Sequence, residues 1–185
     1  MCFLPARCPP EHIWTFFGRQ VVKFTSVVTP FTDENLRLVS QVGVTHVTIR
    51  YPGPGLDELA KVKKRVQGFG LDIAAIEGYL PIENIKLGNE LFGQDVEEMK
   101  LLLANMEQVG IPVACYNFMA GTDWVRTKLD IPERGGAWVT GFNLAEAEKA
   151  VSLRDDVEEI GGQTISAEEL WINLERFLKE ILPTA

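Results

Sequence analysis

The chain has 185 residues, of which 46% are hydrophobic and 24% are charged. This composition is typical of one globular domain with a sizeable core, and it excludes a chain that is mostly disordered or membrane-spanning. The 18 basic and 26 acidic residues give a formal net charge of -8. Because this charge repels phosphate backbones and anionic lipids, neither nucleic acid nor a membrane is expected as a partner.

The amino-terminal segment lacks a recognisable targeting signal. Residues 1–20 contain no uninterrupted apolar stretch of the kind found in signal peptides, and the 3 cysteines of the chain cannot all pair. We therefore expect a cytoplasmic protein. Residues 1–20 are interpreted as an atypical leader and a candidate for disorder, and residues 21–185 as one domain.

Four apolar segments predict the strands of this domain. They are short, rich in Val, Ile and small apolar residues, and do not alternate cleanly with polar residues, a pattern typical of parallel strands buried on both faces. In chain order they are residues 21–28, 45–50, 72–77 and 112–118.

An amphipathic helix is predicted after each strand. Thr32 is a candidate amino-terminal cap of the first helix, and Ser166 with Glu169 forms a capping-box pattern at the last. Gly43, Gly70 and Gly110 are expected to close the first three helices in the left-handed conformation. The apolar stripes, at spacings of three or four, are Leu36, Val39 and Val42; Leu59, Val62, Val66 and Phe69; Val96, Met99, Leu103 and Met106; and Leu170, Leu174, Phe177 and Ile181.

This alternation of strand and helix predicts an α/β fold with right-handed crossovers and a parallel sheet, either doubly wound or curled into a barrel. Four βα units are half of a (β/α)8 TIM barrel, which typically has ~250 residues. Residues 128–165 form a long insertion after the fourth strand. Within it, the sequence around Arg134-Gly135-Gly136 predicts a β-hairpin that could act as a flap or lid over the strand ends.

Polar residues gather just after the fourth strand. Asn117, Asp123, Trp124 and Arg126 all lie within residues 113–127, VACYNFMAGTDWVRT. Ligands of α/β proteins bind at the carboxyl ends of parallel strands, where the loops vary and the strands hold them in place. These four residues are therefore the first candidates for a binding site.

Four segments of the chain together resemble the amino-terminal half of the mannonate dehydratase family. They are AAIEGYLPIENIKLG (residues 74–88), VACYNFMAGTDWVRT (113–127), DIPERGGAWVTGF (130–142) and ELWINLERFLKEILP (169–183). The resemblance implies a xylose-isomerase-like TIM barrel. It also implies a lyase that dehydrates D-mannonate to 2-keto-3-deoxy-D-gluconate in glucuronate catabolism, with Mn²⁺ or Fe²⁺ as cofactor.

The metal ligands implied by the resemblance are not found in this chain. In that family they are His, Cys, His and Asp residues, the first in a His-Pro-Asp-Asp-Pro segment on the strand after the last helix present here. None of His12, His46 or Cys115 matches a ligand position. We expect that the chain is part of a longer enzyme and is inactive alone, because a metal normally stabilises the charge built during such a dehydration.

The resemblance also suggests roles for the candidate residues. Arg126 is the first candidate for binding the sugar-acid carboxylate, because a guanidinium offers paired donors in a plane; its alternative partner is Asp123. Trp124 could stack on a sugar or cover the edge of the core. Asn117 could bind a hydroxyl or satisfy loop backbone groups. No catalytic acid or base is assigned.

Two further candidates close the second and third strands. Arg50 and Glu77 follow these strands and are expected to point toward the barrel mouth, where each could bind substrate or the charge of the other. Alternative functions are another xylose-isomerase-like sugar isomerase or epimerase, and a non-catalytic half-barrel that binds a sugar acid. Because half a barrel exposes strand edges and apolar surface, we also expect self-association.

Overall fold

The computed structural model describes residues 23–119, 125–152 and 165–185, and in them the predicted parallel sheet is confirmed. Its four strands are all parallel, in the order β1-β2-β3-β4. The sheet is open, and no closed barrel is present in the described residues. The strands are β1 (Thr25–Val27), β2 (His46–Ile49), β3 (Asp72–Glu77) and β4 (Ala114–Cys115).

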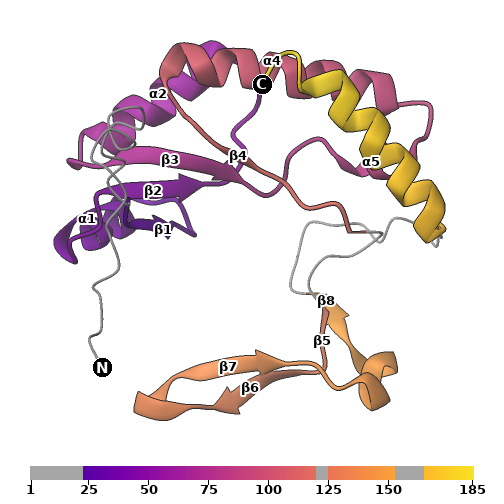
Figure 1. The fold of residues 1–185 in the computed structure, drawn as a ribbon. Helices are drawn as coiled ribbons and strands as arrows, with labels where there is room; N and C mark the ends of the chain where they lie inside the picture. Colours follow the sequence, from indigo (N-terminus) through magenta and orange to yellow (C-terminus); the bar gives the residue numbers. More distant parts are fainter. Residues whose placement is uncertain (1–22, 120–124, 153–164) are drawn as a thin grey trace, which may run out of the picture.

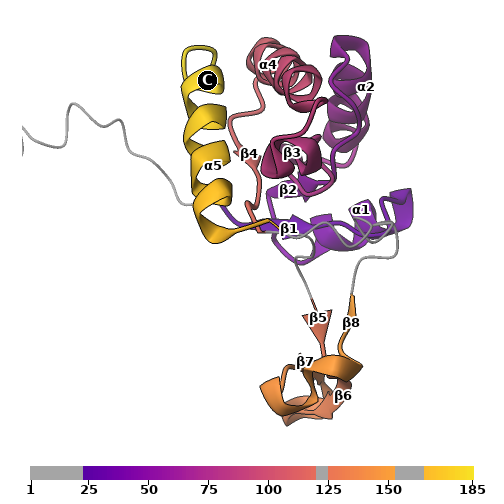
Figure 2. The ribbon, with the colours of Figure 1, turned by 90° about the vertical axis from the view of Figure 1, so that its right-hand side faces the viewer.

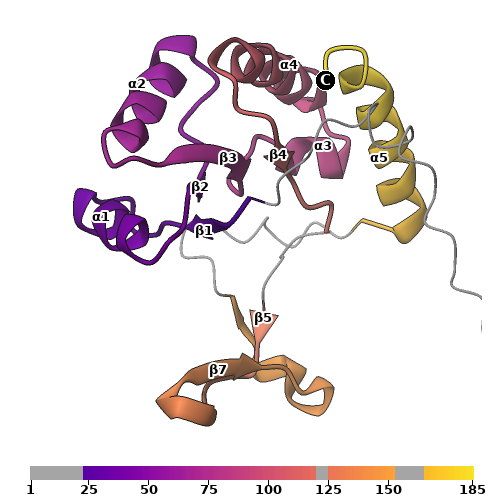
Figure 3. The same ribbon diagram turned by 60° about the vertical axis from the view of Figure 1, so that its left-hand side comes forward.

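Helices lie along the outside of this sheet. Figure 3 shows them in an arc around the strands, with α1 and α2 beside β1 to β3 and with α4 and α5 beside β4. Apolar side chains from both layers form the core, for example Leu36, Ile76 and Phe177, each 0% exposed. No helix in the described residues is both long and apolar enough to cross a membrane. The main helices are α1 (Asp33–Gln41), α2 (Leu56–Gln67), α4 (Phe92–Val109) and α5 (Ala167–Ile181).

The predicted helix ends are confirmed in atomic detail. The Thr32 hydroxyl accepts a hydrogen bond from the Asn35 amide at 3.2 Å and so caps α1. At the start of α5, the Glu169 amide donates to the Ser166 hydroxyl at 3.2 Å, and the Ser166 amide donates to the Glu169 carboxylate at 3.0 Å. These reciprocal bonds satisfy amide groups that the first turn of a helix leaves without partners.

Several elements differ from the sequence-based expectation. β1 covers only Thr25–Val27 of the predicted residues 21–28, of which residues 21 and 22 lie outside the described residues. β4 covers only Ala114–Cys115 of the predicted residues 112–118, because β3 ends at Glu77, opposite Cys115, and offers no partner to the residues that follow. A short helix, α3 (Glu83–Leu87), was not predicted, since five residues are too few to show a helical period. The proposed leader, residues 1–20, lies outside the described residues.

The insertion after β4 contains the predicted hairpin. β6 (Lys128–Pro132) pairs with β7 (Trp138–Gly141) in antiparallel register across a 3-10 turn at Arg134–Gly136. A short antiparallel pair, β5 (Val125–Arg126) with β8 (Val151–Ser152), forms its base. We call residues 125–152 the arm. Figures 1 and 2 show the arm standing apart from the parallel sheet, so its role as a lid stays a prediction.

A partly buried polar cluster joins β2, α3 and α4. The Tyr51 hydroxyl donates to Glu98 at 2.6 Å, and the Asn84 side-chain amide donates to Asp95 at 3.0 Å. Asp95 is only 8% exposed. Burial is the main cause of a raised pKa at Asp95, and the charge of Glu98 adds to it, whereas the hydrogen bond from Asn84 opposes it.

Replacing Asp95 by Asn is expected to stabilise the chain at neutral pH. A raised pKa means that the folded chain holds this proton more tightly than the unfolded chain, so stability falls as pH rises from the unfolded value of about 3.9 through the folded value. Urea unfolding of Asp95→Asn from pH 3 to 7 should show a gain over the parent chain that grows with pH. Gln94→Asn, at an exposed position of α4 next to Asp95, changes no titratable group; it is the control and should show no such trend.

Candidate functional site

The carboxyl ends of β2, β3 and β4 lie side by side, because neighbouring parallel strands end at the same edge of a sheet. Arg50 follows β2, Glu77 is the last residue of β3, and Asn117 follows β4. A hydrogen bond from the Tyr51 amide to the Gly78 carbonyl oxygen, at 3.3 Å, continues the register beyond the first two strands. We call this edge of the sheet the outlet.

Arg50 is held over the end of β3 by backbone and ring contacts. Its Nη1 donates to the carbonyl oxygen of Glu77 at 3.3 Å, and its Cζ lies 5.4 Å from the centroid of the Tyr79 ring. Arg50 therefore contacts the main chain of Glu77, and the predicted alternative, in which Arg50 binds the charge of Glu77, stays a prediction. This arrangement leaves a guanidinium at the outlet, where an anionic ligand could be bound.

Gly78 and Tyr79 belong to this site and were missed by sequence reasoning. A Cβ atom added at Gly78 would lie 2.9 Å from Nη1 of Arg50, so the bare glycine is what lets the guanidinium approach. Tyr79 has a φ of 60°, and among the described residues it is the one non-glycine residue with positive φ. The glycine after a strand was a usable signal, but the backbone angle of Tyr79 has no sequence signature.

Asn117 is fixed by aromatic packing on both sides. The rings of Tyr116 and Phe118 lie 5.4 and 6.1 Å from the ring of Phe177, which belongs to α5 and is fully buried. The Asn117 side-chain oxygen accepts a hydrogen bond from the Met119 amide at 3.4 Å. Asn117 and Tyr116 also line a small hollow at the outlet together with Gly78, Tyr79, Leu80, Ile82 and Glu83. Asn117 thus satisfies loop backbone, as one alternative predicted, and still borders the outlet.

Glu77 lies beside Cys115 in the register of β3 and β4. Burial is the first cause of a raised pKa at the Cys115 thiol, and the negative charge of Glu77 is the second. A thiol with a raised pKa is protonated at neutral pH, so Cys115 is unsuited to act as a nucleophile. Glu77 is the carboxylate that the structure brings to the same strand ends as Arg50.

Arg126 lies elsewhere than expected. It belongs to β5 at the base of the arm, where Nε donates to the Thr140 hydroxyl at 3.0 Å and Nη1 donates to the Val125 carbonyl oxygen at 2.8 Å. Because β5 pairs with β8 and not with the parallel sheet, Arg126 is not brought beside Asn117 at the outlet. Its predicted alternative partner Asp123 and the candidate Trp124 lie outside the described residues, so their predicted roles stay predictions.

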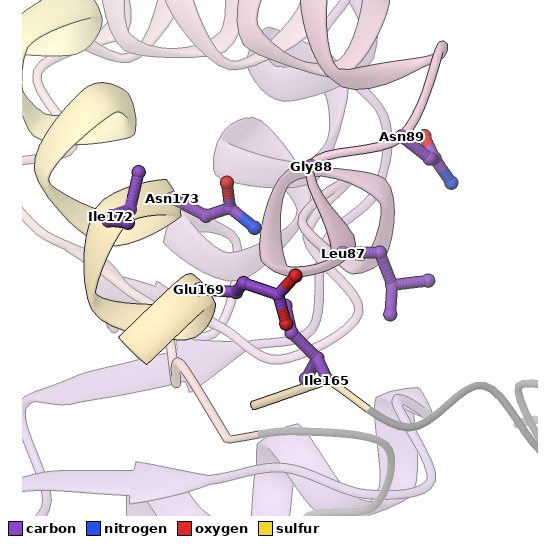
Figure 4. Close-up of a pocket in the computed structure, with 7 residues that line it drawn as sticks. All are labelled: Leu87, Gly88, Asn89, Ile165, Glu169, Ile172 and Asn173. Carbon is purple, nitrogen blue, oxygen red and sulfur yellow. The ribbon is translucent and has the colours of Figure 1, made fainter. Parts of the chain in front are cut away.

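A second cavity, of about 400 Å³, lies between the end of α3 and the start of α5. Figure 4 shows Glu169 and Asn173 of α5 across from Leu87 and Gly88. The polar side chains here stabilise the fold. Glu169 caps α5, and the Asn173 side-chain amide donates to the Lys86 carbonyl oxygen at 2.9 Å. The cavity therefore has a structural explanation that does not require a ligand.

The described residues do not fit a metal ion. They contain no group of three or more His, Cys, Asp and Glu side chains placed to hold one. We therefore assign no chemical step to a metal bound by these residues.

Comparison with known proteins places the chain in a family. A family model described as D-mannonate dehydratase (UxuA) matches residues 33–185. A mannonate dehydratase of Streptococcus equi subsp. zooepidemicus is 33% identical over 147 residues, and one of Bacillus subtilis is 31% identical over 152 residues. The crystal structure of mannonate dehydratase from Streptococcus suis serotype 2 superimposes with a TM-score of 0.75 at 31% identity and covers 89% of this chain.

These matches cover only part of each relative. The aligned region is 70% of this chain but 40% of the Streptococcus equi protein and 42% of the Bacillus subtilis protein. The structural match covers 50% of the Streptococcus suis chain. The resemblance carried by residues 74–88 and 113–127 is thereby confirmed, as is the partial TIM-barrel fold. The chain belongs to the D-mannonate dehydratase (UxuA) family.

Proposed function

We propose that the chain supplies the substrate-binding strand ends of a hydro-lyase that converts D-mannonate to 2-keto-3-deoxy-D-gluconate. The observation that carries this proposal is the family match over residues 33–185, a range that includes Arg50, Glu77 and Asn117 at the outlet. The S. suis structure, which is named a mannonate dehydratase and shares the fold, supports the same activity.

The chemistry of the reaction explains why a guanidinium at the outlet is useful. Removing the proton next to a carboxylate builds negative charge on that carboxylate, and fixed positive donors stabilise this charge. Arg50 is placed to supply such donors, and Asn117 can bind a substrate hydroxyl. Asp123 and Trp124 are kept as proposed substrate contacts contributed by the chain after β4. Arg126 is kept as a contact that requires the arm to act as the predicted lid, because it belongs to β5 at the base of the arm.

The cofactor implied by the family resemblance is Mn²⁺ or Fe²⁺, and the described residues offer it no ligand set. We therefore assign to them the binding of the sugar acid. A non-catalytic role in binding a sugar acid is the second candidate function, because the same residues hold a guanidinium at the outlet without a metal-binding group beside it.

Calorimetric titration with D-mannonate, followed by mass spectrometry of the mixture with Mn²⁺ added, tests both candidates. We expect D-mannonate to bind and D-mannitol, which lacks the carboxylate, not to bind. Formation of a 2-keto-3-deoxy acid would assign the lyase activity to this chain itself. Binding without product is expected from both candidates, because the described residues offer no ligand set for the metal. Failure to bind D-mannonate would contradict both.

We also propose that the chain self-associates. Several large apolar side chains lie largely in solvent, among them Leu144 (80% exposed) and Trp138 (67%), both in the arm. Exposed apolar surface of this kind usually marks a contact with another protein surface. Sedimentation velocity of the samples used for titration should show species larger than 20.7 kDa, whereas a single monomeric boundary would contradict the proposal.

A cytoplasmic location and a small-molecule ligand complete the proposal. The free thiol of Cys115 favours a reducing compartment, because oxidising compartments favour disulfides. The formal net charge of -8 supports neither nucleic acid nor an anionic membrane as a partner.

A further inference from the structure

The guanidinium of Arg50 is held in place from more than one direction. Nη1 donates to the Glu77 carbonyl oxygen at 3.3 Å, and the Tyr79 ring lies 5.4 Å from Cζ. Gly78 permits this approach, since a Cβ there would stand 2.9 Å from Nη1. The last residue of β3 and the two residues after it therefore contact the side chain of Arg50, which follows β2.

The backbone of Tyr79 adopts an unfavourable conformation in order to place its ring against Arg50. A left-handed conformation is unfavourable for a residue with a Cβ. Strained residues of this kind persist where the surrounding structure fixes them, and they cluster at ligand-binding sites. With a φ of 60°, Tyr79 brings its ring to Arg50, and it is 42% exposed at the edge of the outlet hollow.

The remaining donors of Arg50 are suited to a carboxylate. A guanidinium carries five N–H groups in one plane and binds a carboxylate through two parallel hydrogen bonds. Nε and Nη2 of Arg50 have no hydrogen-bond partner among the described residues, since only Nη1 is bonded there. A guanidinium whose orientation is already fixed loses less entropy when it binds a ligand.

We propose that Tyr79 is a positioning residue that, together with Gly78, holds Arg50 as the carboxylate receptor of the outlet. The ligand class is a sugar acid, bound through its carboxylate by Arg50, and in this respect the inference rests on the proposed function. The placement of Arg50 by Tyr79 is a separate part of the claim, and it can be measured without any ligand.

The test compares four variants of the full chain. Arg50→Ala should weaken D-mannonate binding at least about tenfold, the loss of a charge-assisted hydrogen bond of ~1.5 to 3 kcal/mol. Tyr79→Leu should weaken it about two- to fivefold, and Tyr79→Phe should change it less than twofold, because the ring is kept. Arg37→Ala is the matched control, because Arg37 also lies over a ring, that of Phe69 at 5.9 Å, but belongs to α1.

Nitrogen-15 NMR measures the chemical shift of the Arg50 side chain, which a general loss of stability would leave unchanged in folded samples. The Nε–Hε signal of Arg50 should carry a ring-current shift in the parent chain and in Tyr79→Phe and lose it in Tyr79→Leu, while the amide spectrum shows each variant to be folded. Absence of this shift from the parent chain, or unchanged affinity in Tyr79→Leu, would overturn the positioning role.

Titration with D-gluconate separates this inference from the proposed function. D-gluconate carries the same carboxylate as D-mannonate and differs from it at C2. Equal, Arg50-dependent binding of both acids would support Arg50 as the carboxylate receptor and count against D-mannonate as the specific substrate. If neither acid depends on Arg50 for binding, the receptor role is wrong.

Discussion

Replacing Phe177 by Ala is expected to destabilise the chain by about 3 to 5 kcal/mol, the usual cost of removing a large buried aromatic side chain. Phe177 is fully buried, and its ring contacts Tyr116 at 5.4 Å in edge-to-face geometry and Phe118 at 6.1 Å in stacked geometry. The substitution therefore removes the shared support of the two residues that flank Asn117. Urea unfolding followed by circular dichroism measures the loss.

Trp171→Ala is the control for this prediction. Trp171 also belongs to α5 and is also a large aromatic residue, but it is 71% exposed, so its removal should change stability by less than about 0.5 kcal/mol. Similar losses for the two variants would mean that α5 is not anchored through Phe177. In Phe177→Ala samples that still fold, the Asn117 amide signals should shift, because the chain on both sides of this residue has lost its support.

Replacing Gly88 by Ala is expected to cost roughly 2 to 3 kcal/mol, from two separate causes. Gly88 has a φ of 63°, which costs an alanine ~1 to 2 kcal/mol. The new Cβ would also lie 2.6 Å from the side-chain oxygen of Asn173. Asn173 would have to move and lose its hydrogen bond to the Lys86 carbonyl oxygen, at a further ~1 kcal/mol. Thermal unfolding should show a clearly lower midpoint.

Gly43→Ala separates the two causes. Gly43 has a φ of 84°, but a Cβ there would meet no atom within 4 Å, so this variant carries the backbone cost without the contact. In the background of Asn173→Ala, the substitution Gly88→Ala should then cost about as much as Gly43→Ala. If Gly88→Ala is equally harmful with and without the Asn173 side chain, the contact shown in Figure 4 is not its cause.

Sequence patterns predicted the sheet and its main helices because their determinants are local. The glycines at positions 43, 70 and 110 adopt positive φ as expected, and the strand after Gly70 has the predicted bounds, Asp72–Glu77. The Ser166 capping box depends on residues three apart and was equally readable. α3 escaped prediction because a five-residue helix shows no period.

The candidate site was less predictable, because it depends on contacts between distant segments. Arg50 and Glu77 were identified as strand-end residues, yet the sequence does not show that Arg50 binds the Glu77 main chain or lies over the Tyr79 ring. Arg126 follows the fourth strand closely in sequence, but pairing of β5 with β8 carries it into the arm. Short sequence separation from Asn117 was therefore a poor guide to position in space.

The two edges of the sheet at which strands begin and end are connected by segments of different length, and this has an evolutionary consequence. At the rim where β2, β3 and β4 begin, each helix-to-strand return is a tight reversal through one left-handed glycine, at positions 43, 70 and 110. Such reversals tolerate little change in length or residue type. The opposite rim has a short helix after β3 and the whole arm after β4. New ligand preferences can therefore arise by exchanging segments at that rim while the returns beneath it keep the scaffold intact.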